Sequence, residues 1–180
     1  MAHKDLTTTG ALVLIALGAN VAGPLGTPRE TLQKAIERFS EIGISNVKVS
    51  SFHQTPAFPP SNQPDVLNAV AIGRSTRPPQ DILSSLQSIE RELGRVRTIP
   101  WAARSIDLDL LAVGDIVSPQ WHQVAAQGNQ PGEPDGPLIL PHPRMHLRRF
   151  VLEPLVEIAP DWRHPALGLT ARELLARLPA

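Results

Sequence analysis

The apolar positions of the chain recur at strand spacing in four places. The first is a continuous apolar run, ALVLIAL, which ends at Gly18 and has the length of a buried strand. The other three mix apolar with polar or small residues in alternation, which is typical of strands with one buried face. The predicted strands lie at residues 11–17, 47–51, 66–72 and 105–113.

Other apolar positions recur at helical spacing. Residues 27–39 open with the capping-box sequence TPRE, with proline at the first helical position, and continue with an apolar stripe. A second stripe is followed by Gly94, the residue type that favours a left-handed helix cap. A third helix contains Pro154, which should limit or bend it. The predicted helices lie at residues 27–39, 79–93, about 146–158 and 170–178.

The order β-α-β-β-α-β, followed by helices, predicts an α+β protein. We expect a ferredoxin-like antiparallel sheet with helices on one face, extra C-terminal helices, and the other face free to bind a ligand. We predict a flexible N-terminus over residues 1–10 and one domain over residues 11–180. Residues 55–64 hold four prolines and predict a stiff loop, and residues 115–137 predict a long loop, either ordered or disordered.

Composition narrows the classes of function. The chain has 180 residues, with 17 Lys and Arg against 17 Asp and Glu, which argues against non-specific binding to nucleic acid or to a membrane surface. The apolar run near the start is far shorter than the ~20 residues that span a bilayer, and residues 1–10 lack the layout of a signal peptide. The absence of cysteine excludes disulfides and thiolate zinc sites and fits a reducing compartment. We therefore expect a cytoplasmic protein without a membrane or nucleic-acid partner.

The acidic pair Asp107 and Asp109 is the sharpest candidate for chemistry. Side chains alternate along a strand, so the two carboxylates point the same way, about 7 Å apart at their α-carbons, while Ile106 and Leu108 point into the core. Neighbouring carboxylates repel, and Mg²⁺ commonly binds one or two carboxylates together with substrate phosphates. The pair therefore predicts a magnesium site; the alternative is a solvated edge strand with two exposed acids.

Arginines lie near this pair in the sequence. Their planar fork of donors suits phosphate oxygens, and acids and arginines together suit a metal-bridged polyphosphate. The alternative is a set of surface salt bridges of little energetic weight. The sequence contains no GxxxxGK[ST] motif, so a P-loop enzyme is excluded. The arginines are Arg95, Arg97, Arg104, Arg148 and Arg149.

Several other residues are candidates for ligand contacts. His142 lies between two prolines, which suits a pre-positioned donor to phosphate; the alternative is a hydrogen-bonded loop histidine, and its spacing to His146 does not match a zinc site. Asn68 interrupts an apolar strand face, so its amide either binds the edge of a heterocycle or bonds to neighbouring backbone. The remaining polar and aromatic candidates are Thr55, Phe58, Trp101 and Phe150.

Taken in order, these segments resemble the 6-hydroxymethyl-7,8-dihydropterin pyrophosphokinase family of folate biosynthesis. The resemblance covers about residues 11–178. Its most specific motifs are RSIDLD at residues 104–109 and LPHPRMHLRRFVL at residues 140–152. The other matching stretches are LGAN at 17–20, SFHQTP at 51–56, QPDVLNA at 63–69 and IERELGRVR at 89–97.

The resemblance implies a monomeric enzyme that transfers pyrophosphate from ATP to the pterin hydroxymethyl group and releases AMP. It implies that Asp107 and Asp109 hold two Mg²⁺ ions and that Arg95 and Arg104 join them as catalytic residues. Phe150 would stack on the pterin ring, and Trp101 would lie on a mobile loop that closes over both substrates. The implied ATP contacts are Gln87, Glu90, Arg97, Arg104, Leu110, His142, Pro143 and Arg148. The implied pterin contacts are Thr55, Pro56, Ala57, Phe58, Asn68, Trp101 and Phe150.

The chain departs from the family pattern in three places. Val66 stands where many members place an aromatic residue against the pterin, and Phe58 is the candidate to compensate for it. Ala102 and Ala103 replace a common Gly-Pro pair, and residues 97–101 are one residue short, which bears on how the loop closes. Residues 115–137 form a longer segment than the family pattern leads us to expect.

Three other functions fit parts of the pattern. A ferredoxin-like RNA-binding module would use the open sheet face, but it predicts aromatic residues on the central strands and a basic surface, and the sequence has neither. The second is a different metal-dependent enzyme with two neighbouring acids, such as a glycosyl- or nucleotidyltransferase. The third is a family member that binds its ligands without catalysis. Pterin binding that requires Mg²⁺ and a nucleotide, and release of AMP, would separate these alternatives.

Overall fold

The computed structural model describes residues 10–58, 60–95, 103–128 and 136–179. Of the predicted flexible N-terminus, only Gly10 lies within the described residues. In chain order the elements are β1 (Ala11–Ala19), α1 (Pro28–Glu37), β2 (Ser45–Val49), β3 (His53–Thr55), β4 (Val66–Ser75), α2 (Pro79–Glu92), β5 (Asp107–Val113), α3 (Trp121–Ala125), a 3-10 turn (Met145–Leu147), α4 (Arg149–Ile158) and α5 (Ala171–Ala176).

Five strands form one antiparallel sheet, which confirms the predicted α+β class. β1 lies between β4 and β5, and both β2 and β3 pair with β4. The prediction of one strand over residues 47–51 is wrong at its end. The ladder of β2 stops at Val49, and Ser50 binds Val70 through its backbone N–H (2.9 Å) and its hydroxyl (3.0 Å) before β3 begins.

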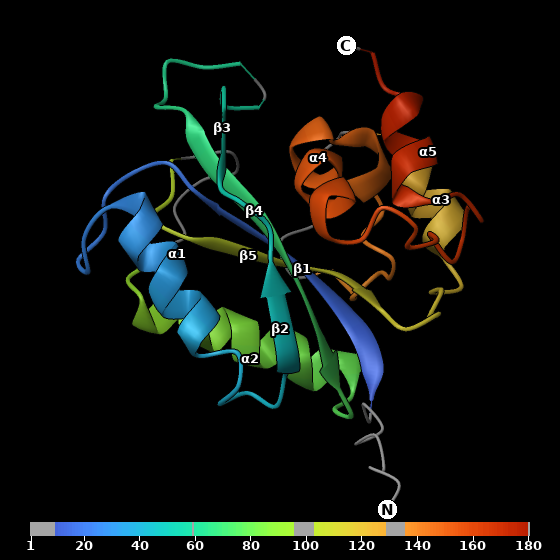
Figure 1. Cartoon of the computed structure of the whole chain (residues 1–180), viewed down its shortest axis with the longest axis horizontal. Coiled ribbons are helices and arrows are strands. Elements are labelled where there is room, and N and C mark those ends of the chain that lie inside the picture. The colour runs from blue at the N-terminus through green and yellow to red at the C-terminus, as the bar shows by residue number, and fades with distance from the viewer. Residues whose placement is uncertain (1–9, 59, 96–102, 129–135, 180) are drawn as a thin grey trace, which may run out of the picture.

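Helices cover both faces of this sheet (Figure 1). The first core lies between the sheet and helices α1 and α2. The second lies between the sheet and helices α4 and α5. The expectation of a free second face is therefore wrong where α4 packs, because its apolar stripe buries the middle of that face. The second core includes Leu14, Val70 and Leu111 of the sheet with Val151, Leu155 and Ile158 of α4 and Leu174 of α5.

Capping boxes confirm the predicted starts of α1 and α5, whereas the helix predicted from about residue 146 begins at Arg149, after the 3-10 turn. Thr27 and Glu30 exchange side-chain and backbone hydrogen bonds in a capping box at α1, and Thr170 and Glu173 do the same at α5. α2 begins at a pair of prolines and ends before Gly94, whose φ of 90° is left-handed. Among the described residues, none of the helices has both the length and the apolar character needed to cross a lipid bilayer.

The predicted loop over residues 115–137 contains an unpredicted helix, α3. Its anchor is Trp121, which is 2% exposed and donates its indole N–H to the carbonyl oxygen of Pro141 at 2.8 Å. Burying this large ring stabilises a short helix that has little amphipathic pattern of its own. Residues 129–135 of the same segment lie outside the described residues.

Candidate active site

Three residues in neighbouring strands form the floor of the candidate site, on the sheet face that α4 partly covers. Gly18 in β1 is the register partner of Asn68 in β4 and of Asp107 in β5. Opposed residues of antiparallel strands project to the same face, and adjacent strands lie about 4.8 Å apart. The side chains of Asn68 and Asp107 therefore start about 10 Å apart, with no side chain between them.

Asp107 and Asp109 project from this face of β5, as predicted. Ile106 and Leu108 alternate with them and are 0% and 3% exposed, so strand alternation separates the acids from the core. The two carboxylates are partly exposed, at 22% for Asp107 and 39% for Asp109. A ligand can therefore reach both of them, which favours the metal-site interpretation over a purely structural one.

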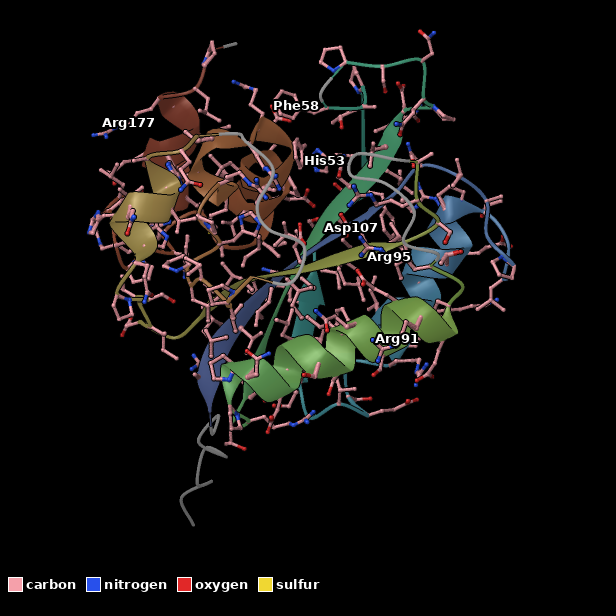
Figure 2. All side chains as sticks on the ribbon, turned by 180° about the vertical axis from the view of Figure 1, so that it is seen from behind. His53, Phe58, Arg91, Arg95, Asp107 and Arg177 are labelled. Atoms are coloured by element: carbon pink, nitrogen blue, oxygen red, sulfur yellow. The ribbon has the colours of Figure 1, made fainter. Side chains whose placement is uncertain are left out.

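Both oxygens of Asp107 are held by arginines. Arg95 donates to Oδ1 at 2.7 Å, and Arg104 donates to Oδ2. Partial burial and the neighbouring Asp109 carboxylate raise the pKa of Asp107 above its usual range, against the opposing effects of Arg104 and Arg95. Figure 2 shows Asp107 and Arg95 next to each other at the start of β5. A positive charge bound near Asp107 would therefore favour its ionised form.

Glu90 lies beneath Asp107 and Arg95 rather than on an open surface. Its side chain is 3% exposed; it accepts the backbone N–H of Leu108 at 2.7 Å and a hydrogen bond from Arg95. Burial, followed by the charge of Asp107, raises the pKa of Glu90 to about 7. Arg95 therefore bridges two carboxylates that come from α2 and β5.

A second basic group lies beside Asp109. Arg148 Nη1 is 3.9 Å from Asp109 Oδ2, and the Arg148 side chain is 10% exposed. Its Nε is buried without a partner among the described residues, and burial lowers the pKa of Arg148. The terminal N–H groups of this guanidinium, beside a partly exposed acid, are suited to bind an anion that arrives there.

His142 is a neutral hydrogen-bond donor in this environment. Its backbone N–H donates to Leu111 at 2.7 Å, and its Nδ1 accepts the backbone N–H of Arg144 at 3.2 Å. Burial, with the charges of Arg148 and Arg144, lowers the pKa of His142 to about 3. Since Nδ1 accepts, the neutral ring carries its proton on Nε2. The Nε2–H group is the one suited to donate to a phosphate oxygen.

The candidate pterin residues Thr55 and Asn68 contact each other. Asn68 is 6% exposed, and its Nδ2 donates to Thr55 Oγ1 at 2.8 Å and to the carbonyl oxygen of Val66 at 3.3 Å. The backbone bond that the alternative interpretation expects is therefore present. The threonine bond fixes which way the amide faces, so Asn68 also has the defined orientation that recognition of a heterocycle requires.

The other predicted site residues differ in where they lie and in how exposed they are. The side chain of Leu110 is 3% exposed and lies in the core towards α2, on the opposite side of the strand from the two acids. Phe150 is the second residue of α4, and its ring centroid lies 5.5 Å from the Arg148 guanidinium carbon; Phe58 is 48% exposed. Arg97 and Trp101 lie outside the described residues. Gln87, Pro143 and Ala57 are half-buried, and Pro56 is exposed.

Asn20 belongs to the site although its side chain was not a predicted site group. It is 6% exposed, and its Oδ1 accepts the backbone N–H of Arg104 at 2.8 Å. Its Nδ2 donates to Gln63 Oε1 at 3.1 Å and to the carbonyl oxygen of Pro64 at 3.3 Å. Asn20 thus ties the end of β1 to the segment before the acids and to the loop before β4. The signal in the sequence is a polar residue directly after a buried strand.

The donor set fits magnesium that arrives with a polyphosphate. Among the described residues there is no group of three or more His, Cys, Asp or Glu side chains that could hold a metal alone. Asp107 and Asp109 supply two carboxylates, and Mg²⁺ commonly uses one or two of these together with phosphate oxygens and water. Arg95 and Arg104 already donate to the two oxygens of Asp107, so an ion bound there would share those oxygens with the arginines or displace one of them.

An acidic pair surrounded by arginines, beside an oriented amide on an α+β fold, is an arrangement suited to an enzyme that transfers phosphate groups. The family model described as 7,8-dihydro-6-hydroxymethylpterin-pyrophosphokinase (HPPK) matches residues 14–160. The chain belongs to this family, which confirms the resemblance found in the sequence.

Curated relatives agree with this assignment. The chain is 36% identical over 166 residues to a 2-amino-4-hydroxy-6-hydroxymethyldihydropteridine pyrophosphokinase of Synechocystis, covering 92% of this chain and 75% of the relative. The enzyme of the same name from Pseudomonas aeruginosa is 37% identical over 169 residues, covering 93% and 91%. That from Haemophilus influenzae is 38% identical over 148 residues, covering 82% and 81%.

Solved structures support the fold. The HPPK-DHPS protein of Plasmodium falciparum with pteroate superposes with a TM-score of 0.67 at 12% identity, covering 94% of this chain and 44% of that chain. The wild-type form with STZ-DHP gives a TM-score of 0.64 at 13% identity, covering 94% and 42%. This chain thus spans less than half the length of these larger proteins, and at this identity the likeness concerns the fold alone.

Proposed function

We propose that this chain transfers pyrophosphate from ATP to the hydroxyl group of 6-hydroxymethyl-7,8-dihydropterin, releasing AMP and the pterin diphosphate, as a step of folate biosynthesis. The observation that carries the proposal is the pairing of both Asn68 and Asp107 with Gly18. This pairing supports a heterocycle site and a metal–polyphosphate site on one flat surface about 10 Å apart, a distance suited to a hydroxymethylpterin whose oxygen attacks a phosphorus atom.

The acids and arginines divide the work of phosphate binding. Asp107 and Asp109 would hold two Mg²⁺ ions, which when bound neutralise and align the triphosphate. Arg95, Arg104 and the Nε2–H group of His142 donate to phosphate oxygens, and Arg148 adds a donor beside Asp109. These donors would stabilise the charge that develops on the leaving AMP.

Pterin binding would use the other end of the floor. Asn68, whose Nδ2 donates to Thr55 and Val66, would present its Oδ1 acceptor to the ring edge, and Phe150 in the first turn of α4 would supply an aromatic surface. Phe58 is an exposed ring in the loop after β3, suited to cover the other face of the pterin where Val66 leaves it open. Pro56, Ala57 and Trp101 complete the proposed set.

The remaining proposed nucleotide contacts are Gln87, Glu90, Arg97, Leu110 and Pro143. Glu90 would act through Arg95, because its carboxylate is buried under that residue. Leu110 can offer only its backbone, because its side chain faces the core. We also propose a cytoplasmic monomer without nucleic-acid or membrane partners; equal numbers of acidic and basic residues and the absence of cysteine support this proposal.

A product assay tests the reaction. Purified protein is incubated with ATP, Mg²⁺ and the dihydropterin, and nucleotides and pterins are separated by chromatography; omission of each component is the control. We expect one AMP for each pterin diphosphate formed. Formation of ADP with a pterin monophosphate would overturn the proposed pyrophosphate transfer. Tight pterin binding without AMP would instead identify a binding-only member.

Calorimetry distinguishes the proposed pterin pyrophosphokinase from other metal-dependent transferases. The dihydropterin and a non-hydrolysable ATP analogue are titrated in both orders, with and without Mg²⁺. We expect pterin binding to strengthen when nucleotide and Mg²⁺ are both present, because the sites share one surface. Pterin binding too weak to detect under every condition would contradict the proposed substrate.

A further inference from the structure

A fourth residue continues the floor of the site. His53 in β3 is the register partner of Asn68, so His53, Asn68, Gly18 and Asp107 form one line across β3, β4, β1 and β5, which we call the site row. Opposed residues of antiparallel strands share a face, so the imidazole lies beside the Asn68 amide, on the side away from Asp107. In the view of Figure 2, His53, Asp107 and Arg95 follow one another across the strands.

Helix α4 spans nearly the same distance as the site row. Four strands at a spacing of about 4.8 Å make the row about 14 Å long, and the eight residue steps from Arg149 to Glu157 rise about 12 Å in a helix, with Arg148 directly before it. At one end Arg148 lies 3.9 Å from Asp109, and at the other Glu157 Oε2 lies 3.0 Å from His53 Nε2. One helix is therefore tied to the sheet beside both proposed substrate sites.

Glu157 makes a dense set of contacts for a surface residue. Its Oε1 accepts the backbone N–H of Ser51 at 2.8 Å, and its Oε2 accepts the Ser51 hydroxyl at 2.7 Å in addition to the His53 contact. These bonds lower the pKa of Glu157 to about 2, so it is ionised at neutral pH. Hydrogen bonds to an ionised acceptor are stronger than hydrogen bonds between neutral groups. The contacts of Glu157 together are therefore worth more than a single exposed ion pair, which stabilises a protein little.

These contacts stabilise a strand that is otherwise weakly held. β3 has three residues and, within the described part of the chain, pairs with β4 alone. Its last residue is Thr55, whose Oγ1 accepts the Asn68 amide and so sets the direction in which that amide faces. Phe150 lies seven residues before Glu157, which places both side chains on the same side of α4.

We propose that Glu157 is a positioning residue for the pterin: through Ser51 and His53 it fixes β3 against α4, and β3 fixes the Asn68 amide through Thr55. The proposal rests on the proposed function for its substrate. It predicts that loss of the Glu157 carboxylate disturbs the pterin end of the site row and leaves the nucleotide end unchanged.

The test compares two glutamates of the same helix. Glu157→Gln keeps the size of the side chain and removes the carboxylate. The control is Glu153→Gln, one turn earlier, where the carboxylate accepts Arg149 Nε at 2.9 Å within α4. Pterin affinity is measured with Mg²⁺ and the ATP analogue present, and nucleotide affinity is measured separately. We expect Glu157→Gln to weaken pterin binding about tenfold, equal to about 1.4 kcal/mol, with nucleotide affinity unchanged. Glu153→Gln should change neither.

A spectroscopic readout separates failure of this proposal from failure of the substrate assignment. The Asn68 side-chain amide is followed by 15N NMR without any ligand, assigned by its loss in Asn68→Ala. Its resonances should move in Glu157→Gln and in His53→Gln and stay in place in Glu153→Gln. The positioning role would be overturned if the resonances stayed in place in both Glu157→Gln and His53→Gln. Equal pterin affinities in Glu157→Gln and Glu153→Gln would overturn it as well. Moved resonances in a protein that binds no pterin would retain the Glu157–Asn68 link and overturn the substrate.

Discussion

Asn68 and Asp107 lie two strands apart and are register partners of the same residue, Gly18. A Cβ atom at Gly18 would lie 3.4 Å from Asn68 Oδ1 and 3.6 Å from Val66 Cγ1, which is ordinary contact. The fold therefore tolerates a methyl group at this position. A larger side chain would rise from the floor between the two proposed substrate sites.

We predict that Gly18→Ala keeps the thermal unfolding temperature and most of the activity of the unmodified protein. In Gly18→Leu, pterin affinity should fall by at least about tenfold. The leucine side chain would occupy the space above the floor while the strand pairing stays intact. Pterin titration and thermal unfolding of both variants check this. Normal pterin affinity in Gly18→Leu would show that the ligand lies elsewhere.

Removal of either acid should slow turnover strongly without unfolding the protein. Asp107→Asn and Asp109→Asn each remove a magnesium ligand, and we expect turnover to fall by about 10²–10³, equivalent to several kcal/mol of transition-state stabilisation. Asp161→Asn is the control, because this acid is 85% exposed and pairs only with Arg172 among the contacts seen. Steady-state AMP release and circular dichroism are measured for all three. Wild-type turnover in both active-site variants would exclude the proposed mechanism.

Arg104 should oppose magnesium while no nucleotide is bound. It occupies Asp107 Oδ2, so its replacement frees a carboxylate oxygen and increases the local negative charge. We expect Arg104→Gln to bind Mg²⁺ more tightly in the absence of ATP, by calorimetry, and to turn over more slowly because a phosphate donor is lost. Weaker Mg²⁺ binding would mean that Arg104 supports the ion rather than competing with it.

Stability should fall in acid because of His164. This imidazole is 0% exposed, its Nδ1 accepts Leu167 N–H at 3.2 Å, and its Nε2 has no partner within the described part of the chain. Burial lowers the pKa of His164 from 6.5 to about 4. The unfolded chain therefore binds a proton at higher pH than the folded one, and stability decreases as the pH falls from about 6.5 to about 4.

Urea unfolding at several pH values, followed by tryptophan fluorescence, measures this dependence, since Trp121 and Trp162 lie 5.2 and 5.8 Å from the His164 ring. We expect His164 to account for at most about 3–4 kcal/mol of the loss, at about 1.4 kcal/mol for each unit of pKa shift. In His164→Asn, whose amide oxygen can still accept Leu167 N–H, the pH dependence should be weaker. An identical dependence in both proteins would assign it to other groups.

Local sequence patterns predicted the elements that such patterns determine. The capping boxes at Thr27 and Thr170 and the alternation around Asp107 act between residues a few positions apart, so they can be read directly. The burial of Glu90 also had a signal, since Glu90 lies four residues after Leu86, at the edge of the apolar stripe of α2.

Contacts between distant segments could not be read from such patterns. His53 and Glu157 are 104 residues apart, and only the packing of α4 across the sheet brings them together. β3 was missed because three residues are too few to establish a period, and its position depends on Ser50 and Val70. α3 was missed because a single buried indole, rather than an amphipathic stripe, stabilises it.

Gly18 lies at the centre of the floor and has no side chain, so nothing rises between the two positions that pair with it, Asn68 and Asp107. Strand spacing fixes the separation of the backbone positions that carry the proposed ring-binding amide and the proposed phosphate-anchoring carboxylate. If the substrates bind as proposed, an alcohol with one carbon more or fewer between its ring and its hydroxyl group would place the attacking oxygen away from the phosphorus. Under the proposed function, the backbone thus contributes to selectivity for chain length.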